Sequence, residues 1–210
     1  MNIFSISETE DNALSDFLEK TMSELNSFFE INWKFNRPRV CIYNNRKTAD
    51  SLREEKREPW QIGWIEGNNV FVMAREKIGI ESPHKKIQDD KEYLSLLKHE
   101  VVHCFFNILS KRKYKPDWLW EGIAIYLSGQ LEHKKPIEKF DNFIKFYDKT
   151  GEEVYKESGF AVKFLIEKFG KERILRLIKA LSNIGNSEEF IEKFKDIYGF
   201  ELSYGNFNID

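Results

Sequence analysis

Two histidines enclose a glutamate in the run H-E-V-V-H at residues 99–103, and this run carries the clearest chemical signal in the chain. His99 and His103 are four residues apart, a spacing that puts both imidazoles on one face of an α-helix. Two neutral imidazoles placed this way can bind one Zn²⁺ ion at about 2.0–2.1 Å each. Glu100 lies where a carboxylate can accept a proton from a metal-bound water. The run therefore predicts a metal site with Glu100 as general base.

Glu121, in the run W-L-W-E-G at residues 118–122, is the candidate third ligand. Apolar residues surround it, and Pro116 followed by Asp117 predicts a short buried helix with Asp117 as its N-cap. A carboxylate in a buried helix is unfavourable unless it is paired or bound to a metal. Two histidines and one glutamate leave the fourth zinc position for water and substrate, as in catalytic sites. The alternative is a glutamate that gains only from the dipole of its own helix.

The H-E-V-V-H run lies within a segment of strong helical periodicity over residues 89–113. Aspartates can cap the start of this segment, and the cations at 111–113 suit the end of a helix. Asn107, four residues after His103 on the same face, is a candidate partner of that ligand. The apolar residues that recur at three- and four-residue steps are Tyr93, Leu94, Leu97, Val101, Phe105 and Ile108.

The H-E-x-x-H run and the run W-L-W-E-G-I-A-I-Y at 118–126 together resemble the gluzincin metallopeptidases. The resemblance is closest to the small peptidase MA-like branch, whose second ligand helix typically reads W-L-x-E-G-x-A-x-Y. It implies a zinc metallopeptidase that binds one Zn²⁺ per chain through His99, His103 and Glu121. A site of this composition can also accept Co²⁺ or Mn²⁺.

The same resemblance continues in the run Y-K-E-S-G-F-A at 155–161. It implies that the Tyr155 hydroxyl donates a hydrogen bond to the oxyanion of the tetrahedral intermediate, beside Glu100 as the second catalytic residue. The spacing from Tyr155 to the glycine is one residue longer than in gluzincin aminopeptidases, and an ordinary tyrosine near a helix start is the alternative. His133 is a weaker candidate for this role, because the residues around it are typical of a solvated loop. His84 is expected at the surface.

In gluzincins an edge strand before the metal-binding helix pairs with the extended backbone of the substrate. Residues 70–74 are the strand expected to do so in this chain, and an ordinary core strand is the alternative. The aminopeptidases of the group carry a G-x-M-E-N element on this strand, whose glutamate the run G-N-N-V-F at 67–71 lacks. The resemblance therefore favours endopeptidase-like cleavage of a peptide or protein substrate over aminopeptidase activity.

The overall pattern predicts an α+β fold, zincin- or gluzincin-like, in a single domain over residues 1–210. A small N-terminal β-sheet with helices is expected over 1–85, and a mostly helical half that carries the metal ligands over 86–210, with the metal in the cleft between them. The expected elements are a helix opened by a capping box at 7–10 and continuing to Phe29, strands at 33–35 and 39–43, a polar helix at 48–57, a hairpin of 61–65 with 70–74, and helices from 89 to about 198, interrupted at 115–116, 135–136, 151, 170 and 184–186.

Composition narrows the classes of partner. The 210 residues carry a net charge of −2, so no basic field favours nucleic acid. The two cysteines are too few for a disulfide framework. Neither a signal peptide nor an apolar run of about 18 residues is visible, so we expect a cytoplasmic protein without a membrane partner. The oligomeric state is left open.

Three other functions are compatible with parts of this pattern. The first is a metal-dependent regulatory or binding module whose peptidase fold is idle or directed at one target, and the presence of Glu100 argues against it. The second is a structural zinc site, which the open fourth position disfavours. The third is a cytoplasmic regulatory H-E-x-x-H protease that cleaves one repressor, which the W-L-W-E-G context disfavours.

Overall fold

The computed structural model of the chain describes residues 8, 10–56, 58–85, 87, 89–147, 149, 151 and 153–208. The fold is α+β and 60% helical, with a small three-stranded sheet, which confirms the predicted class. Contacts divide the chain into two compact units, residues 1–27 with 31–101 and residues 28–30 with 102–210. None of the described helices is both long enough and apolar enough to cross a membrane.

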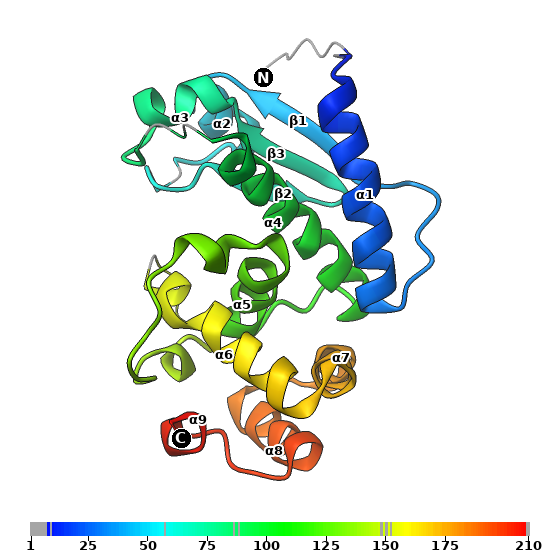
Figure 1. The fold of residues 1–210 in the computed structure, drawn as a ribbon, viewed down its shortest axis with the longest axis vertical. Helices are drawn as coiled ribbons and strands as arrows, with labels where there is room; N and C mark the ends of the chain where they lie inside the picture. Colours follow the sequence, from blue (N-terminus) through cyan, green and yellow to red (C-terminus); the bar gives the residue numbers. More distant parts are fainter. Residues whose placement is uncertain are drawn as a thin grey trace. The chain divides into compact units, whose positions relative to one another are not determined.

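The first unit contains the sheet and most of the N-terminal helices (Figure 1). Its elements are α1 (Asn12–Phe29, whose last residues belong to the second unit), β1 (Arg39–Tyr43), α2 (Arg46–Arg53), β2 (Gly63–Glu66), β3 (Asn69–Met73), α3 (Arg75–Glu81) and the first part of α4 (Asp90–Leu109). The second unit contains the rest of α4, α5 (Asp117–Ser128), the 3₁₀ turns η1 (Gln130–His133) and η2 (Phe143–Lys145), α6 (Val154–Phe169), α7 (Lys171–Ala180), η3 (Leu181–Asn183), α8 (Ser187–Tyr198) and α9 (Tyr204–Phe207).

Strand β3 is the centre of the sheet, which has the order β1-β3-β2. β3 pairs parallel with β1 and antiparallel with β2. The predicted hairpin of β2 and β3 is confirmed, and Gly67 in its turn adopts φ 60°, which glycine tolerates best. The expectation that residues 70–74 form an edge strand is wrong, because β3 pairs with β2 along one edge and with β1 along the other. Within the described sheet, β1 and β2 are the edges.

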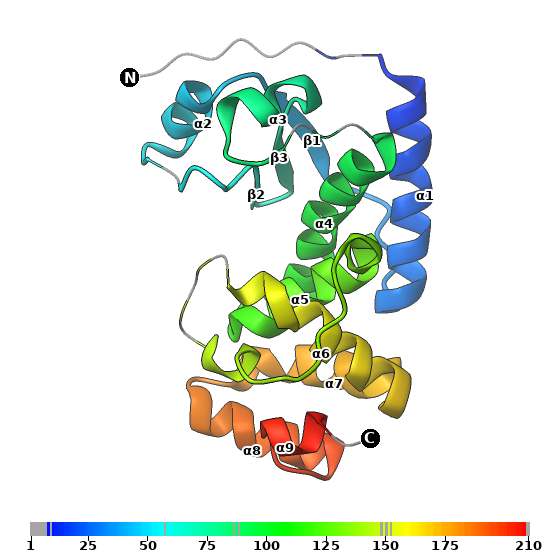
Figure 2. The same cartoon turned by 60° about the vertical axis from the view of Figure 1, so that its left-hand side comes forward.

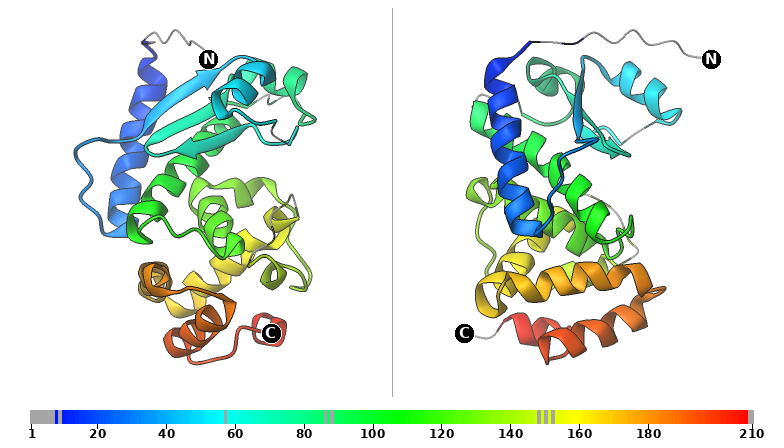
Figure 3. Two further views of the ribbon diagram at one scale, coloured as in Figure 1. Left: turned by 180° about the vertical axis from the view of Figure 1, so that it is seen from behind. Right: turned by 90° about the vertical axis from the view of Figure 1, so that its right-hand side faces the viewer.

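The two faces of the sheet bury different side chains, because successive residues of a strand point to opposite faces. Val70 and Val72 of β3 are fully buried on one face, and Gly63 of β2 pairs with Val72 there. On the other face, Tyr43 and Trp64 belong to a core cluster with residues of α2 and α3. Figure 3 shows α1 and α2 on opposite sides of the sheet. The sheet is thus covered by helices on both faces.

Two N-terminal predictions need correction. The expected strand at 33–35 is wrong, since the Trp33 indole donates to the Phe35 carbonyl (2.8 Å) and the Trp33 N–H donates to the Asn26 side chain (2.8 Å). These bonds satisfy backbone groups that a sheet would otherwise pair. Two residues of the expected capping box, at positions 7 and 9, lie outside the described residues. The first helix is capped by the Asp11 side chain, which accepts from the Leu14 N–H (2.9 Å).

Helices α5 and α6 of the second unit cross at very short range. A Cβ added at Gly122 would lie 2.5 Å from the Ser158 carbonyl oxygen, and one at Gly159 would lie 2.4 Å from Ile125. The glycines of the W-L-W-E-G and Y-K-E-S-G runs therefore serve the same purpose, which is to let two helix backbones touch. Helices α7 and α8 pack beyond α6 (Figure 2).

The helix expected between Pro136 and Gly151 is wrong, because the described residues of that segment form only the single turn η2. The buried carboxylate of Glu157 accepts from the backbone N–H groups of Asn142 (2.9 Å) and Phe143 (3.0 Å). A side chain of α6 thus replaces the helical hydrogen bonds. Aromatic residues of the segment nevertheless belong to a cluster of rings, which contains Phe140, Phe143, Phe164, Phe169, Phe194, Tyr198 and Phe207.

We expect Glu157→Ala to lower the free energy of unfolding by about 2–4 kcal/mol, since it leaves the backbone N–H groups of Asp141, Asn142 and Phe143 without their acceptor. Urea denaturation followed by circular dichroism measures this change. Glu153→Ala is the matched control, because Glu153 is exposed and its carboxylate pairs with the exposed Lys156 side chain. Its effect should stay within about 0.5 kcal/mol. Equal destabilisation by both variants would contradict the anchoring role of Glu157.

Candidate metal centre

The three chemically important residues of the first run lie on one buried face of α4. His99, Glu100 and His103 are 5%, 7% and 4% exposed. The predicted helix is confirmed, and it runs unbroken from Asp90 to Leu109. Because the helix is continuous, its own geometry holds the two imidazoles one turn apart on the same side. α4 therefore presents two nitrogen donors together, with a carboxylate next to the first.

Helix α5 supplies Glu121, although its N-terminus differs in detail from the prediction. Pro116 occupies the cap position and no side chain caps the helix, so the expected N-cap role of Asp117 is wrong. The N–H groups of Asp117 and Trp118 donate instead to the carbonyls of Tyr147 (3.4 Å) and Phe146 (3.1 Å). Carbonyl groups of the loop before α6 thus accept hydrogen bonds from the N–H groups at the start of α5. The Glu121 side chain, in the second turn, is 15% exposed.

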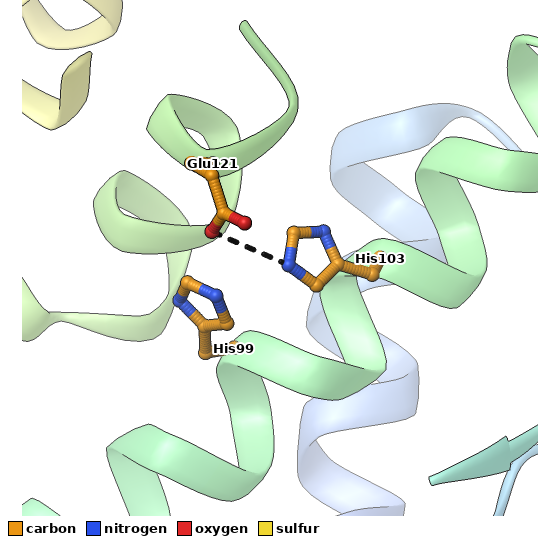
Figure 4. Close-up of side chains that lie close together, drawn as sticks. All are labelled: His99, His103 and Glu121. Atoms are coloured by element: carbon orange, nitrogen blue, oxygen red, sulfur yellow. Dashed lines mark ion pairs between the residues drawn. The ribbon is translucent and has the colours of Figure 1, made fainter. Parts of the chain in front are cut away.

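His99, His103 and Glu121 form a compact group of possible metal ligands. One donor atom from each lies within 4.8 Å of the other two, and the side chains point toward one another from α4 and α5 (Figure 4). The Nε2 atom of His103 is 3.6 Å from Oε2 of Glu121. In a tetrahedral zinc site with bonds of 2.0–2.1 Å, ligand atoms are about 3.3 Å apart. The His103–Glu121 pair is therefore close to the tetrahedral spacing, and the full group, within 4.8 Å, would contract around a bound metal.

The donor set also suits a metal chemically. Two imidazole nitrogens and one carboxylate oxygen match the ligands that Zn²⁺ accepts, and Co²⁺ or Mn²⁺ can use the same donors. Burial of a carboxylate is unfavourable without a cation or strong hydrogen-bond donors. The Glu121 carboxylate points toward His103. A glutamate that gained only from the dipole of its own helix would not need this orientation. These residues could bind a metal ion.

The carboxylate of Glu100 lies against the backbone of β2 at Gly63. A Cβ added at Gly63 would be 2.5 Å from Oε1 of Glu100, so a side chain there would displace the Glu100 carboxylate. The sequence pattern indicated Gly63 only as part of a hairpin. The available signal was a glycine inside a strand pattern, which often marks a close approach of another group. Both residues belong to the first unit, so this contact is internal to it.

The remaining predicted residues have varied outcomes. Tyr155 is the second residue of α6 and is half-buried, on the helix face that also carries Ser158, and its catalytic role stays a prediction. His133 is exposed in η1, and His84 is exposed with Nε2 2.6 Å from a backbone carbonyl, which agrees with the surface placement expected for both. The role suggested for Asn107 as a partner of His103 stays a prediction.

Comparison with protein-family models, with curated proteins and with solved structures finds no match to this chain. The resemblance to gluzincins therefore depends on the short runs at 99–103, 118–126 and 155–161. Any function proposed for the site must therefore be argued from its own residues.

Proposed function

We propose that the chain is a gluzincin-type zinc peptidase that hydrolyses bonds inside polypeptides. The observation that carries the proposal is the group of His99, His103 and Glu121, with a buried carboxylate one residue after the first histidine. A structural zinc site has no need of that carboxylate, whereas hydrolysis needs a proton acceptor. The ligand composition and the general base together support chemistry at this position.

Each residue has a defined task in the proposed reaction. Zn²⁺, held by the three ligands, would lower the pKa of a bound water toward 7 and polarise the scissile carbonyl. Glu100 accepts a proton from the attacking water and passes it to the leaving amine. Tyr155 donates a hydrogen bond to the oxyanion of the tetrahedral intermediate. The low exposure of His99 and Glu100 keeps bulk water away and strengthens these electrostatic interactions.

The edge of the sheet supports an extended peptide as substrate. Within the described sheet, β2 pairs only with β3, so its other edge has backbone groups able to bind a further strand. Gly63 of β2 lies beside Glu100, and a peptide paired along this edge would therefore pass the general base. Recognition through main-chain hydrogen bonds does not require a free terminus, which favours cleavage within a chain. The substrate-pairing role expected of residues 70–74 is accordingly assigned to β2.

One observation favours a second candidate, a regulatory or binding module without catalysis. At 3.6 Å, His103 and Glu121 are also close enough for an ion pair if the imidazole is protonated. A proton would then take the place of the metal, and the group would only join α4 to α5. Metal analysis distinguishes the two candidates directly.

We expect the purified chain to retain about one zinc ion after dialysis. It should cleave a denatured, fluorescently labelled protein, lose this activity on treatment with a chelator, and regain it with added Zn²⁺. Zinc content is measured by elemental analysis and cleavage by the appearance of new N-termini. Bound zinc without cleavage of any denatured substrate would favour the regulatory module. Absence of zinc even after reconstitution would favour the ion pair.

A further inference from the structure

We infer that Trp120 is a positioning residue for the metal centre, with its indole holding the imidazole ring of His103 in the orientation that binds the metal. The inference rests on the metal site of the proposed function but not on peptide hydrolysis. It concerns a residue for which the resemblance implies no role, since Trp120 is the variable position of W-L-x-E-G.

The indole of Trp120 stacks flat on the imidazole of His103. The ring centroids are 4.2 Å apart and the ring planes differ by 8°. Trp120 immediately precedes Glu121 in α5, so adjacent residues of one helix contact His103 in two ways. The indole covers one face of the imidazole, and the Glu121 carboxylate is 3.6 Å from its Nε2 atom.

Trp120 is itself held by neighbouring rings. Its indole makes edge-to-face contacts with Phe106 (5.1 Å between centroids) and with Tyr114 (6.2 Å). Phe106 is three residues after His103, so both project from a similar side of α4. The indole therefore contacts α4 at two points, and His103 stacks on a surface that is already fixed.

The stack has a direct consequence for metal binding. The bond between the Cβ atom and the imidazole ring of a histidine rotates over a broad range. An unsupported ring can therefore turn so that its nitrogen no longer points at the metal. A flat indole at van der Waals distance opposes that tilt. The orientation of the His103 ring that metal binding requires is then established when the protein folds, so the site is preorganised before the metal binds.

Trp118, two residues earlier in the same helix, provides the internal comparison. It is 1% exposed and makes edge-to-face contacts with Phe143 and Phe190 in the core of the second unit. Trp120 is half-buried and presents its face to a ligand ring. The two tryptophans of the W-L-W-E-G run thus have different environments, and a substitution of Trp118 is a matched control for one of Trp120.

The first test is zinc affinity, measured by competition with a chromophoric chelator for the wild type, Trp120→Leu, Trp120→Phe and Trp118→Phe. Trp120→Leu should bind zinc about three- to tenfold more weakly, the range expected for loss of an aromatic pair. Trp120→Phe should show a smaller loss, because it keeps a ring. Trp118→Phe should lower the melting temperature and leave the zinc affinity within about twofold of wild type.

The second test uses Co²⁺ as a fluorescence quencher. Quenching by a bound paramagnetic ion falls steeply with distance, so the tryptophan stacked on a ligand should supply most of the quenched emission. Co²⁺ should therefore quench the wild type and Trp118→Phe, and quench Trp120→Phe much less. Loss of quenching in Trp120→Phe would show that Trp120 is the tryptophan next to the ion, and the change in zinc affinity reports whether it positions His103.

Unchanged zinc affinity in Trp120→Leu would overturn the positioning role and leave the proposed metal site intact. Wild-type quenching in Trp120→Phe would overturn the placement of Trp120 beside a metal ligand. A wild-type chain that binds neither ion would overturn both proposals. Far-ultraviolet circular dichroism checks that each variant folds. If Trp120→Leu does not fold, Trp120→Phe carries the test on both measurements.

Discussion

Glu100→Gln should reduce peptide hydrolysis by about 10²- to 10⁴-fold, the range expected for removal of a general base. The amide has the shape of the carboxylate but cannot take a proton from the attacking water. Zinc content should remain at the wild-type level, because Glu100 is not among the three possible ligands. The loss should appear in kcat with little change in KM, since the substrate is expected to bind along β2.

Two controls make this result specific. Glu92→Gln alters an exposed glutamate two turns earlier on α4 and should leave both hydrolysis and zinc content unchanged. Glu100→Asp keeps the charge but withdraws the carboxylate from Gly63, so it should retain part of the activity. Hydrolysis at the wild-type rate in Glu100→Gln would remove Glu100 from the mechanism. Loss of zinc in the same variant would instead identify Glu100 as part of the metal binding itself.

Glu121→Ala should weaken zinc binding by about 100-fold or more and thereby abolish activity. Mutation of residues that merely support a ligand typically costs about 10- to 100-fold in affinity, and Glu121 is proposed to contact the metal directly. The substitution leaves two imidazoles, and the charge that would partly neutralise Zn²⁺ is lost. Elemental analysis after dialysis against a buffered low zinc concentration measures the effect.

Thermal unfolding provides a second readout for Glu121→Ala. Zinc should raise the melting temperature of the wild type, because a ligand that binds only the folded state stabilises it, and it should have little effect on the variant. Glu167→Ala is the control, since Glu167 is exposed on α6, pairs with Lys163 at 3.9 Å and is not among the possible metal ligands. Wild-type zinc content in Glu121→Ala would mean that another residue completes the site, and the W-L-W-E-G assignment would fail.

Local features were predictable because they depend on neighbours in the chain. The four-residue spacing of His99 and His103, the apolar periodicity of α4 and the turn residues of the β2–β3 hairpin all act within one or two adjacent elements. The bounds of β1 agree with the prediction residue for residue. The errors at 33–35 and within 137–150 arose where a side chain, Asn26 or Glu157, captured backbone N–H groups. Such capture depends on residues well apart in sequence, and propensity does not register it.

The residues able to do chemistry could be identified before any fold was known. Their types and spacing placed two imidazoles and a carboxylate on one helix face and pointed to Glu121 as the third candidate ligand. Three contacts emerged only from the folded chain: the Glu121 carboxylate lies 3.6 Å from His103, Trp120 stacks on the same ring, and Glu100 lies against Gly63 of an edge strand. Helix geometry repeats every few residues and can be followed along the chain, whereas these contacts come from the packing of separate elements. That packing depends on the volume and shape of side chains brought together from across the chain.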